Sequence, residues 1–287
     1  MGHRTILNLP GLHVMDIRET DQYKSIWREL CSDTDYVKKL KNYNILYRTI
    51  YFAANFPSGM PDLEYSDAAV DAYQKMTFYN SWEIANSKGS YGKRLKTPDG
   101  TIIAADLMTG WWIPFKYFMR LDTWVFPKAG KSRKHYLCEL AEICPKEANE
   151  EALLSWMHKN SGRNKKSCKE LLKFLSVVYT EGNIIPIITN FKPGRSLDGW
   201  DTKMMNIFDD SINTAQALAW RRYVTDIFGS KENFVDKNLL SAYMIDRNTP
   251  KRIWNPEISY ESASAQNWIS YFNTMTTNIR ERAKKQH

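Results

Sequence analysis

Apolar and aromatic residues recur at steps of three and four positions along most of this chain, and this helical spacing is its strongest constraint on the fold. The clearest stripe lies in the helix predicted over 35–56, and it contains Tyr36, Leu40, Tyr43, Tyr47, Ile50 and Tyr51. The same spacing predicts helices over 21–30, 66–86, 133–143, 147–159, 165–178, 202–228, 233–245 and 262–285, and one that begins near Trp112. Ser66 is the expected N-cap of the 66–86 helix.

Strand signals are few and local. Residues 92–107 are predicted to form a β-hairpin, because Thr97-Pro98-Asp99-Gly100 is a turn sequence followed by a β-branched run. A second short strand is expected at Ile184–Ile188, after a Gly182-Asn183 turn that we expect to need positive φ. The predicted fold class is therefore α+β, predominantly helical with a small antiparallel sheet or hairpin.

The chain length allows one large domain or two ordinary ones. Its 287 residues are 43% hydrophobic, which is enough for a sizeable core. We divide it into a helical N-terminal part, 1–127, that contains the hairpin, and a helical C-terminal part, 128–287. No segment resembles a linker, so one continuous domain is the alternative.

The N-terminal sequence and the cysteines indicate a soluble cytoplasmic protein. Asn8, Pro10, His13 and Asp16 interrupt the apolar positions that a signal peptide would need. No run approaches the roughly 20 apolar residues that cross a bilayer, so no membrane association is predicted. The four cysteines, at 31, 138, 144 and 168, are too few for a disulfide scaffold in a chain of this length.

The formal net charge is +8, from 40 Lys and Arg against 32 Asp and Glu. The excess lies in three runs, Lys128–Lys134, Lys159–Lys173 and Arg280–Lys285, whereas a dedicated nucleic-acid-binding protein usually concentrates it on one element. These runs are interpreted as solvated loops and helix ends, with an acidic partner or nucleic acid as the alternative. Lys93, Arg94, Lys165 and Lys166 are the candidate phosphate-binding residues.

One group of potential zinc ligands is present. His135, Cys138, Cys144 and His158 fall within 24 positions, and zinc prefers nitrogen and sulfur ligands. However, there is no CxxC knuckle, and Cys144 follows the end of the helix that contains His135 and Cys138. We therefore predict no metal site, with these four residues as the candidates for zinc, and no cofactor.

Common catalytic motifs are missing. The chain has no G-x-S-x-G, no G-x-x-x-x-G-K-[ST] and no G-x-G-x-x-G sequence. The nearest approach to a metal-dependent nuclease site is Asp198, Asp201 and Lys203, which follow the predicted strand. Asp201 is better explained as the cap of the helix that follows. The pair Asp209-Asp210 is interpreted as the solvated face of a helix.

Four stretches resemble a group of bacterial and phage-associated proteins that have no assigned activity. The first, VYTEGNIIPI at 178–187, resembles their YTxGNxIP turn, and GWDTKMMNIF at 199–208 resembles the helix that follows it. FYNSW at 78–82 and DLMTGWWIPF at 106–115 also resemble that group, so the similarity spans about the middle half of the chain. The chain has Glu181 where the group usually has Ile. The resemblance implies a bacterial cell as the site of action and assigns no catalytic residue.

Two functional hypotheses follow. The first is a non-catalytic protein-interaction protein, because the chain is rich in the Trp, Tyr and Arg residues that dominate interfaces. Trp111 and Trp112, within an aromatic-rich segment, are its candidate contacts, and homo-oligomers fit this class. The resemblance implies a modulator or inhibitor of a defence complex. The alternative is a metal-dependent enzyme that acts on nucleic acid or nucleotides.

Overall fold

The computed structural model describes residues 15–32, 35–60, 62–86, 93–125, 133–188 and 199–286. The helices within these ranges are α1 (Lys24–Trp27), α2 (Tyr36–Leu40), α3 (Ile45–Ala54), α4 (Asp67–Gln74), α5 (Trp112–Phe118), α6 (Leu121–Trp124), α7 (Arg133–Ile143), α8 (Glu150–Ser161), α9 (Lys165–Leu175), α10 (Gly199–Phe208), α11 (Ala215–Phe228), α12 (Lys231–Lys237) and α13 (Ala265–Gln286). The strands are β1 (Glu83–Asn86), β2 (Lys93–Lys96), β3 (Ile102–Leu107), β4 (Ile184–Ile188), β5 (Met244–Asp246) and β6 (Thr249–Pro250). The predicted class, α+β and mostly helical, is confirmed.

Four strands form an antiparallel sheet in the order β1-β2-β3-β4. The predicted hairpin is β2 and β3, and the Gly100 N–H donates to the Thr97 carbonyl in its turn. The predicted strand β4 pairs with β3, with Ala105 opposite Pro186. Helices α5 to α9 therefore lie in the connection between two neighbouring strands.

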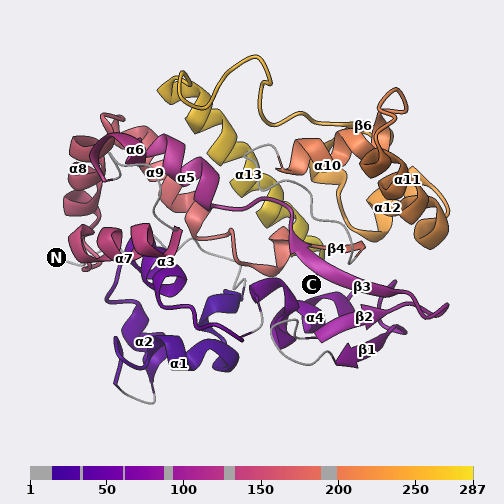
Figure 1. The fold of residues 1–287 in the computed structure, drawn as a ribbon, viewed down its shortest axis with the longest axis horizontal. Coiled ribbons are helices and arrows are strands. Elements are labelled where there is room, and N and C mark those ends of the chain that lie inside the picture. Colours follow the sequence, from indigo (N-terminus) through magenta and orange to yellow (C-terminus); the bar gives the residue numbers. More distant parts are fainter. Residues whose placement is uncertain are drawn as a thin grey trace.

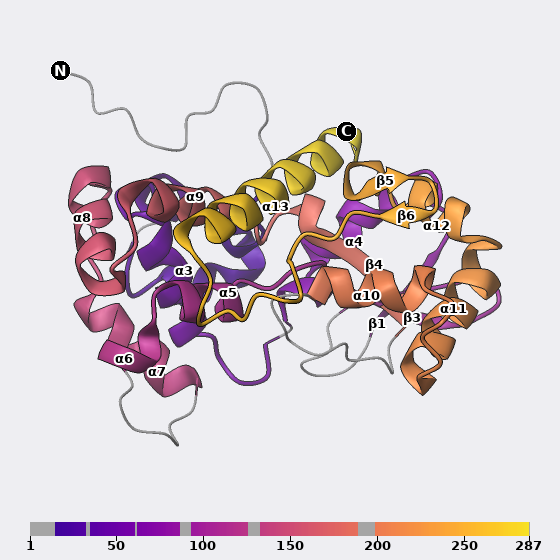
Figure 2. The same cartoon turned by 90° about the horizontal axis from the view of Figure 1, so that it is seen from above.

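The long helix α13 lies between two groups of elements (Figure 1). On one side are α1 to α3 and α5 to α9, and on the other are the sheet, α4 and α10 to α12. Figure 2 shows α13 running past α9 toward the β5–β6 hairpin. Buried residues from both sides of position 127 belong to one hydrophobic cluster. Its largest fully buried side chains include Trp27, Trp111, Trp200, Trp220 and Trp268, so the abundant tryptophans mainly build the core.

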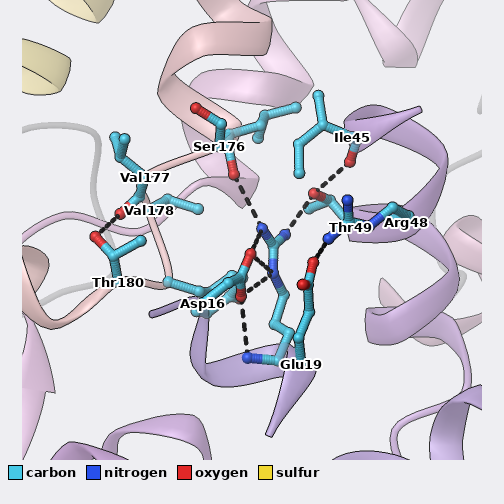
Figure 3. A network of polar contacts seen from close by, with 12 residues as sticks. Asp16, Glu19, Ile45, Arg48, Thr49, Ser176, Val177, Val178 and Thr180 are labelled. Carbon is cyan, nitrogen blue, oxygen red and sulfur yellow. Dashed lines mark hydrogen bonds and ion pairs between the residues drawn. The ribbon is translucent and has the colours of Figure 1, made fainter. Parts of the chain in front are cut away.

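A buried charged network attaches the first described residues to the helices (Figure 3). The Arg18 guanidinium donates to both carboxylate oxygens of Asp16, to the Thr49 hydroxyl at 2.6 Å and to the Leu175 carbonyl. Beside it, Arg48 pairs with Glu19. Each guanidinium is at least nine-tenths buried, and such a group is tolerated only when it is paired. The network therefore joins residues 16–19 to α3 and to the end of α9.

Two predicted helices in the N-terminal third are shorter than expected, because local caps and tertiary contacts end them. The helix predicted over 35–56 is two helices, and the Asn44 side chain caps the second by accepting from the Tyr47 N–H. Ser66 caps α4 as predicted, but α4 ends at Gln74, and 83–86 is strand β1. The pairing of β1 with the edge of the hairpin overrides its helical spacing.

The two helices predicted in the C-terminal third are also divided. The 202–228 segment is split into α10 and α11, and Thr214 caps the second. Asp209 and Asp210 lie in the turn between them and not on a helix face; Asp209 accepts from Ser211, and Asp210 pairs with Lys231. The 233–245 segment contains α12, which ends at Lys237, and then β5.

The conformation predicted for Gly182 is wrong. Gly182 does not have positive φ, and it lies in the short 3₁₀ helix η4 (Glu181–Asn183). A Cβ atom at this position would lie 2.2 Å from the Ile279 carbonyl oxygen. The glycine is needed because α13 approaches the backbone closely, not because the turn requires a left-handed residue.

Candidate functional site

A cleft of about 440 Å³ opens between α10 and the segment 252–261. The residues that line it are Asp201, Thr202, Met205, Asn206, Ile212, Arg252, Trp254, Pro256, Ile258, Ser259, Tyr260 and Glu261. This volume is in the range of about 300–1,000 Å³ that is typical of ligand sites. Four lining residues come from α10 and seven from the 252–261 segment, so the relative position of these two elements determines the shape of the cleft.

Asp201 fixes the two elements to each other. Its carboxylate accepts from the Ile253 N–H and the Trp254 N–H, each at 2.8 Å. Asp201 is 8% exposed, and hydrogen bonds to an ionised acceptor are among the stronger ones. The sequence singled out Asp201 as a metal ligand or a helix cap. In the structure it lies in the first turn of α10 and holds a distant loop instead.

Aromatic packing makes the loop side of the cleft rigid. The Trp254 indole N–H donates to the Ile258 carbonyl at 2.9 Å, which closes the segment on itself. The Trp254 ring also packs against Tyr260, Trp268 and Tyr271, with centroids 5.1 to 5.7 Å apart. This wall is therefore continuous with the core that contains α13.

The polar groups of the cleft include one amide that makes no hydrogen bond with the described residues. Asn206 is 6% exposed and lines the cleft, and within the described residues its side-chain amide makes no hydrogen bond. Its amide atoms are not among the described side-chain atoms that are both fully buried and unpaired, so they are open to the cleft. Arg252 and Glu261 also line the cleft, and both are exposed. The cleft thus combines an apolar wall, an amide that the fold does not use and two opposite charges.

A second polar group lies on the other side of α10. The Lys203 ammonium donates to the Asp106 carboxylate at 3.0 Å and to the Leu107 carbonyl at 2.8 Å. Lys203 is 4% exposed. Burial, together with the negative charge of Asp106, raises the pKa of the nearby Glu64 carboxyl to about 8. Sequence analysis selected Lys203, but it missed Glu64 and Asp106 because both lie far from Lys203 in sequence. Asp198 lies outside the described residues.

The raised pKa of Glu64 makes the stability depend on pH. Between the ordinary glutamate pKa of 4.5 and about 8, the folded protein keeps the Glu64 proton while the unfolded chain releases it. The free energy of unfolding should therefore fall as the pH rises through this range. Glu64→Gln cannot release the proton, so its stability should fall less steeply between pH 5 and 8. Urea unfolding followed by tryptophan fluorescence at both pH values would measure this, and equal slopes would contradict the assignment.

The residues predicted to bind a partner do not form one surface. Trp111 is 1% exposed and donates to the Tyr179 hydroxyl at 2.7 Å, so it is part of the core. Trp112 is half-buried, and the Arg133 guanidinium lies 5.6 Å from its ring. Lys93 pairs with Asp67, and Lys165 pairs with Glu151. The side chains of Arg94, half-buried on β2, and Lys166, exposed on α9, come from separate elements.

The four potential zinc ligands do not converge. The His135 ring pairs with Glu139 at 2.8 Å, and the His158 ring lies 2.7 Å from the Arg163 carbonyl. Cys138 is exposed on α7, whereas Cys144 is buried beyond the end of that helix. No group of three or more His, Cys, Asp and Glu residues in the described part of the chain is arranged to hold a metal ion.

The thiols should differ in reactivity. Burial raises the pKa of Cys31, Cys144 and Cys168, and Cys138 is the exposed cysteine. Because the thiolate is the reactive species, a thiol reagent at pH 8 should label one cysteine rapidly in the native protein and all four in denaturant. Cys138→Ser should lose the rapid phase. Rapid labelling of two or more cysteines in the native protein would contradict this arrangement.

Comparisons with protein-family models, with curated proteins and with solved structures gave no match. In the part of the chain that the structure describes, no helix has both the length and the apolar character needed to cross a membrane.

Proposed function

We propose that this protein acts by binding another protein, and that the partner binds in the cleft between α10 and the segment 252–261. The observation that carries the proposal is the Asn206 amide, which lines an open cleft and makes no hydrogen bond with the described residues. An amide that the fold does not use is available to a ligand, and a few such polar groups give a binding site its specificity.

Site-specific photocrosslinking in bacterial cells would test this proposal. A photoreactive amino acid at Pro256, which lines the cleft and is exposed, should form a covalent adduct with a second protein. The same amino acid at the exposed Lys166 on α9 is the matched control and should not form this adduct. The adduct should disappear when Asn206→Leu is added. Equal adducts from both positions, or none from the cleft, would contradict the proposal.

The resemblance to bacterial and phage-associated proteins supports one biological role. We propose that the bound partner belongs to a bacterial defence complex and that binding modulates or inhibits it. Mass spectrometry of the photocrosslinked adduct would identify the partner. Size-exclusion chromatography with light scattering would show whether the protein binds as a monomer or as a homo-oligomer.

A second proposal is an enzyme that acts on nucleic acid or nucleotides. It is favoured by the grouping of Asp106, Lys203 and Glu64, because a carboxyl group with a raised pKa next to a paired lysine is an arrangement found in active sites. Incubation of labelled DNA and RNA with the protein and Mg²⁺ or Mn²⁺ tests it. Cleavage that Lys203→Met abolishes would support this proposal, and the absence of cleavage would count against it.

A further inference from the structure

The lining of the α10 cleft also identifies what kind of protein segment it accepts; this step rests on the function proposed above. We infer that the occupant is an extended peptide segment of the partner in which a large apolar side chain lies next to an acidic side chain. Three features of the cleft carry this inference: its apolar wall, the Asn206 amide and the charge of Arg252.

The apolar wall selects a large apolar side chain. Met205 of α10 and Ile258 of the loop are half-buried, and Trp254 forms the rigid wall beside them. Methionine adapts its shape to a bound side chain, whereas a packed tryptophan does not. A leucine or phenylalanine side chain would cover this surface and remove it from water, which contributes about 25 cal/mol per Å² of apolar area.

The Asn206 amide favours a peptide backbone. A carboxamide contains one acceptor oxygen and two donor hydrogens, and a peptide group in an extended segment presents one N–H and one C=O. The carboxamide can therefore accept from the peptide N–H and donate to the peptide C=O, and neither group carries a net charge. In the free protein the amide has no hydrogen-bond partner among the described residues, so its donors and its acceptor are available to a ligand in the cleft.

The charges at the cleft favour an acidic side chain next to the large apolar one. Arg252 is exposed at the cleft, and the whole chain has a net charge of +8, which attracts acidic segments over long distances. Glu261 lines the same cleft and would repel a segment with several acidic residues. A single acidic side chain can pair with Arg252. Repulsion by Glu261 then disfavours segments with further acidic residues, which adds specificity.

The aromatic wall of the cleft is not suited to binding a nucleotide. A base needs a free aromatic face on which to stack. The Trp254 ring is 5% exposed and packs against three other rings, and the Tyr260 ring packs against Tyr117 and Trp254. Glu261 would also repel the phosphates. We therefore assign the cleft to a peptide.

A displayed library of random ten-residue peptides, selected on the purified full chain, tests this inference. The enriched peptides should share one large apolar residue next to Asp or Glu, and Asn206→Leu should abolish the enrichment. Arg252→Glu should change the selected charge from acidic to basic. Both variants should first be shown to unfold at the wild-type denaturant midpoint. Glu261→Gln, the matched control at the cleft, should retain or strengthen the acidic preference.

Fluorescence anisotropy with a selected peptide and with a fluorescent ATP analogue completes the test. The peptide Kd should rise about tenfold for Arg252→Ala, which corresponds to about 1.4 kcal/mol. Enriched peptides without the apolar–acidic pair, enrichment that survives Asn206→Leu, or displacement of the peptide by ATP would each overturn the inference. If photocrosslinking at Pro256 succeeds while no peptide is enriched, the proposed function stands and this inference fails.

Discussion

Replacing Gly182 with alanine should destabilise the protein by about 3 kcal/mol, because the added methyl group has no space. Its Cβ would lie 2.2 Å from the Ile279 carbonyl oxygen and 2.9 Å from the Ala283 Cβ, both on α13. The first contact is with backbone, so no side-chain rotation relieves it. To accept the methyl group, α13 must move away from η4, and its packing against neighbouring elements must loosen. Urea unfolding followed by circular dichroism would measure the loss.

Gly110→Ala is the matched control for this substitution. Gly110 has no positive φ, and a Cβ at this position would meet no atom within 4 Å. It should change the free energy of unfolding by no more than about 0.5 kcal/mol. Adding Ala283→Gly to Gly182→Ala should restore little stability, because the contact with the Ile279 carbonyl remains. Full recovery in the double variant would show that the side chain, not the backbone of α13, requires the glycine.

Elements with strong local signals were predicted well. The turn Thr97-Pro98-Asp99-Gly100 fixes the hairpin, because few other conformations suit these residues. The bounds of α7 and β4 agree with the prediction, and α13 begins and ends within three residues of it. The sequence did not reveal where the long predicted helices break. Those breaks depend on contacts between distant residues, such as the pairing of β1 with β2 and the bridge between Tyr43 and Glu147.

The candidate site was predicted less well for the same reason. Asp201 and Lys203 were selected as residue types that can perform chemistry, and both have specific buried roles in the structure. Their partners, the backbone at 253–254 and Asp106, are about 50 and 97 positions away in sequence. Nothing in the sequence indicated a role for Asn206, because an asparagine within an amphipathic helix pattern is expected to be an exposed polar residue. It stands out only when the fold places it in a cleft, where its amide has no partner among the described residues.

Arg282→Met should cost about 3–5 kcal/mol, the second large effect that we expect. The Arg282 side chain is fully buried on α13, and its guanidinium donates to the Asn238 carbonyl at 2.7 Å and to the Ile184 carbonyl at 2.6 Å. It also donates to the Gly182 carbonyl at 3.1 Å. Methionine fills similar volume but leaves these buried carbonyls without their donor. The denaturant midpoint from tryptophan fluorescence would report the loss.

Two further variants separate hydrogen bonding from charge. Arg282→Lys keeps the positive charge, but a single ammonium group cannot reach carbonyls on both sides of the planar guanidinium, so it should recover only part of the stability. Lys284→Met, on the same helix but exposed and paired with Glu281, should change stability by less than about 0.5 kcal/mol. If Arg282→Lys is as stable as the wild type, the charge alone accounts for the effect. The intermediate value is expected, because a single arginine connects α13 to the backbone at 182–184 and to the end of α12.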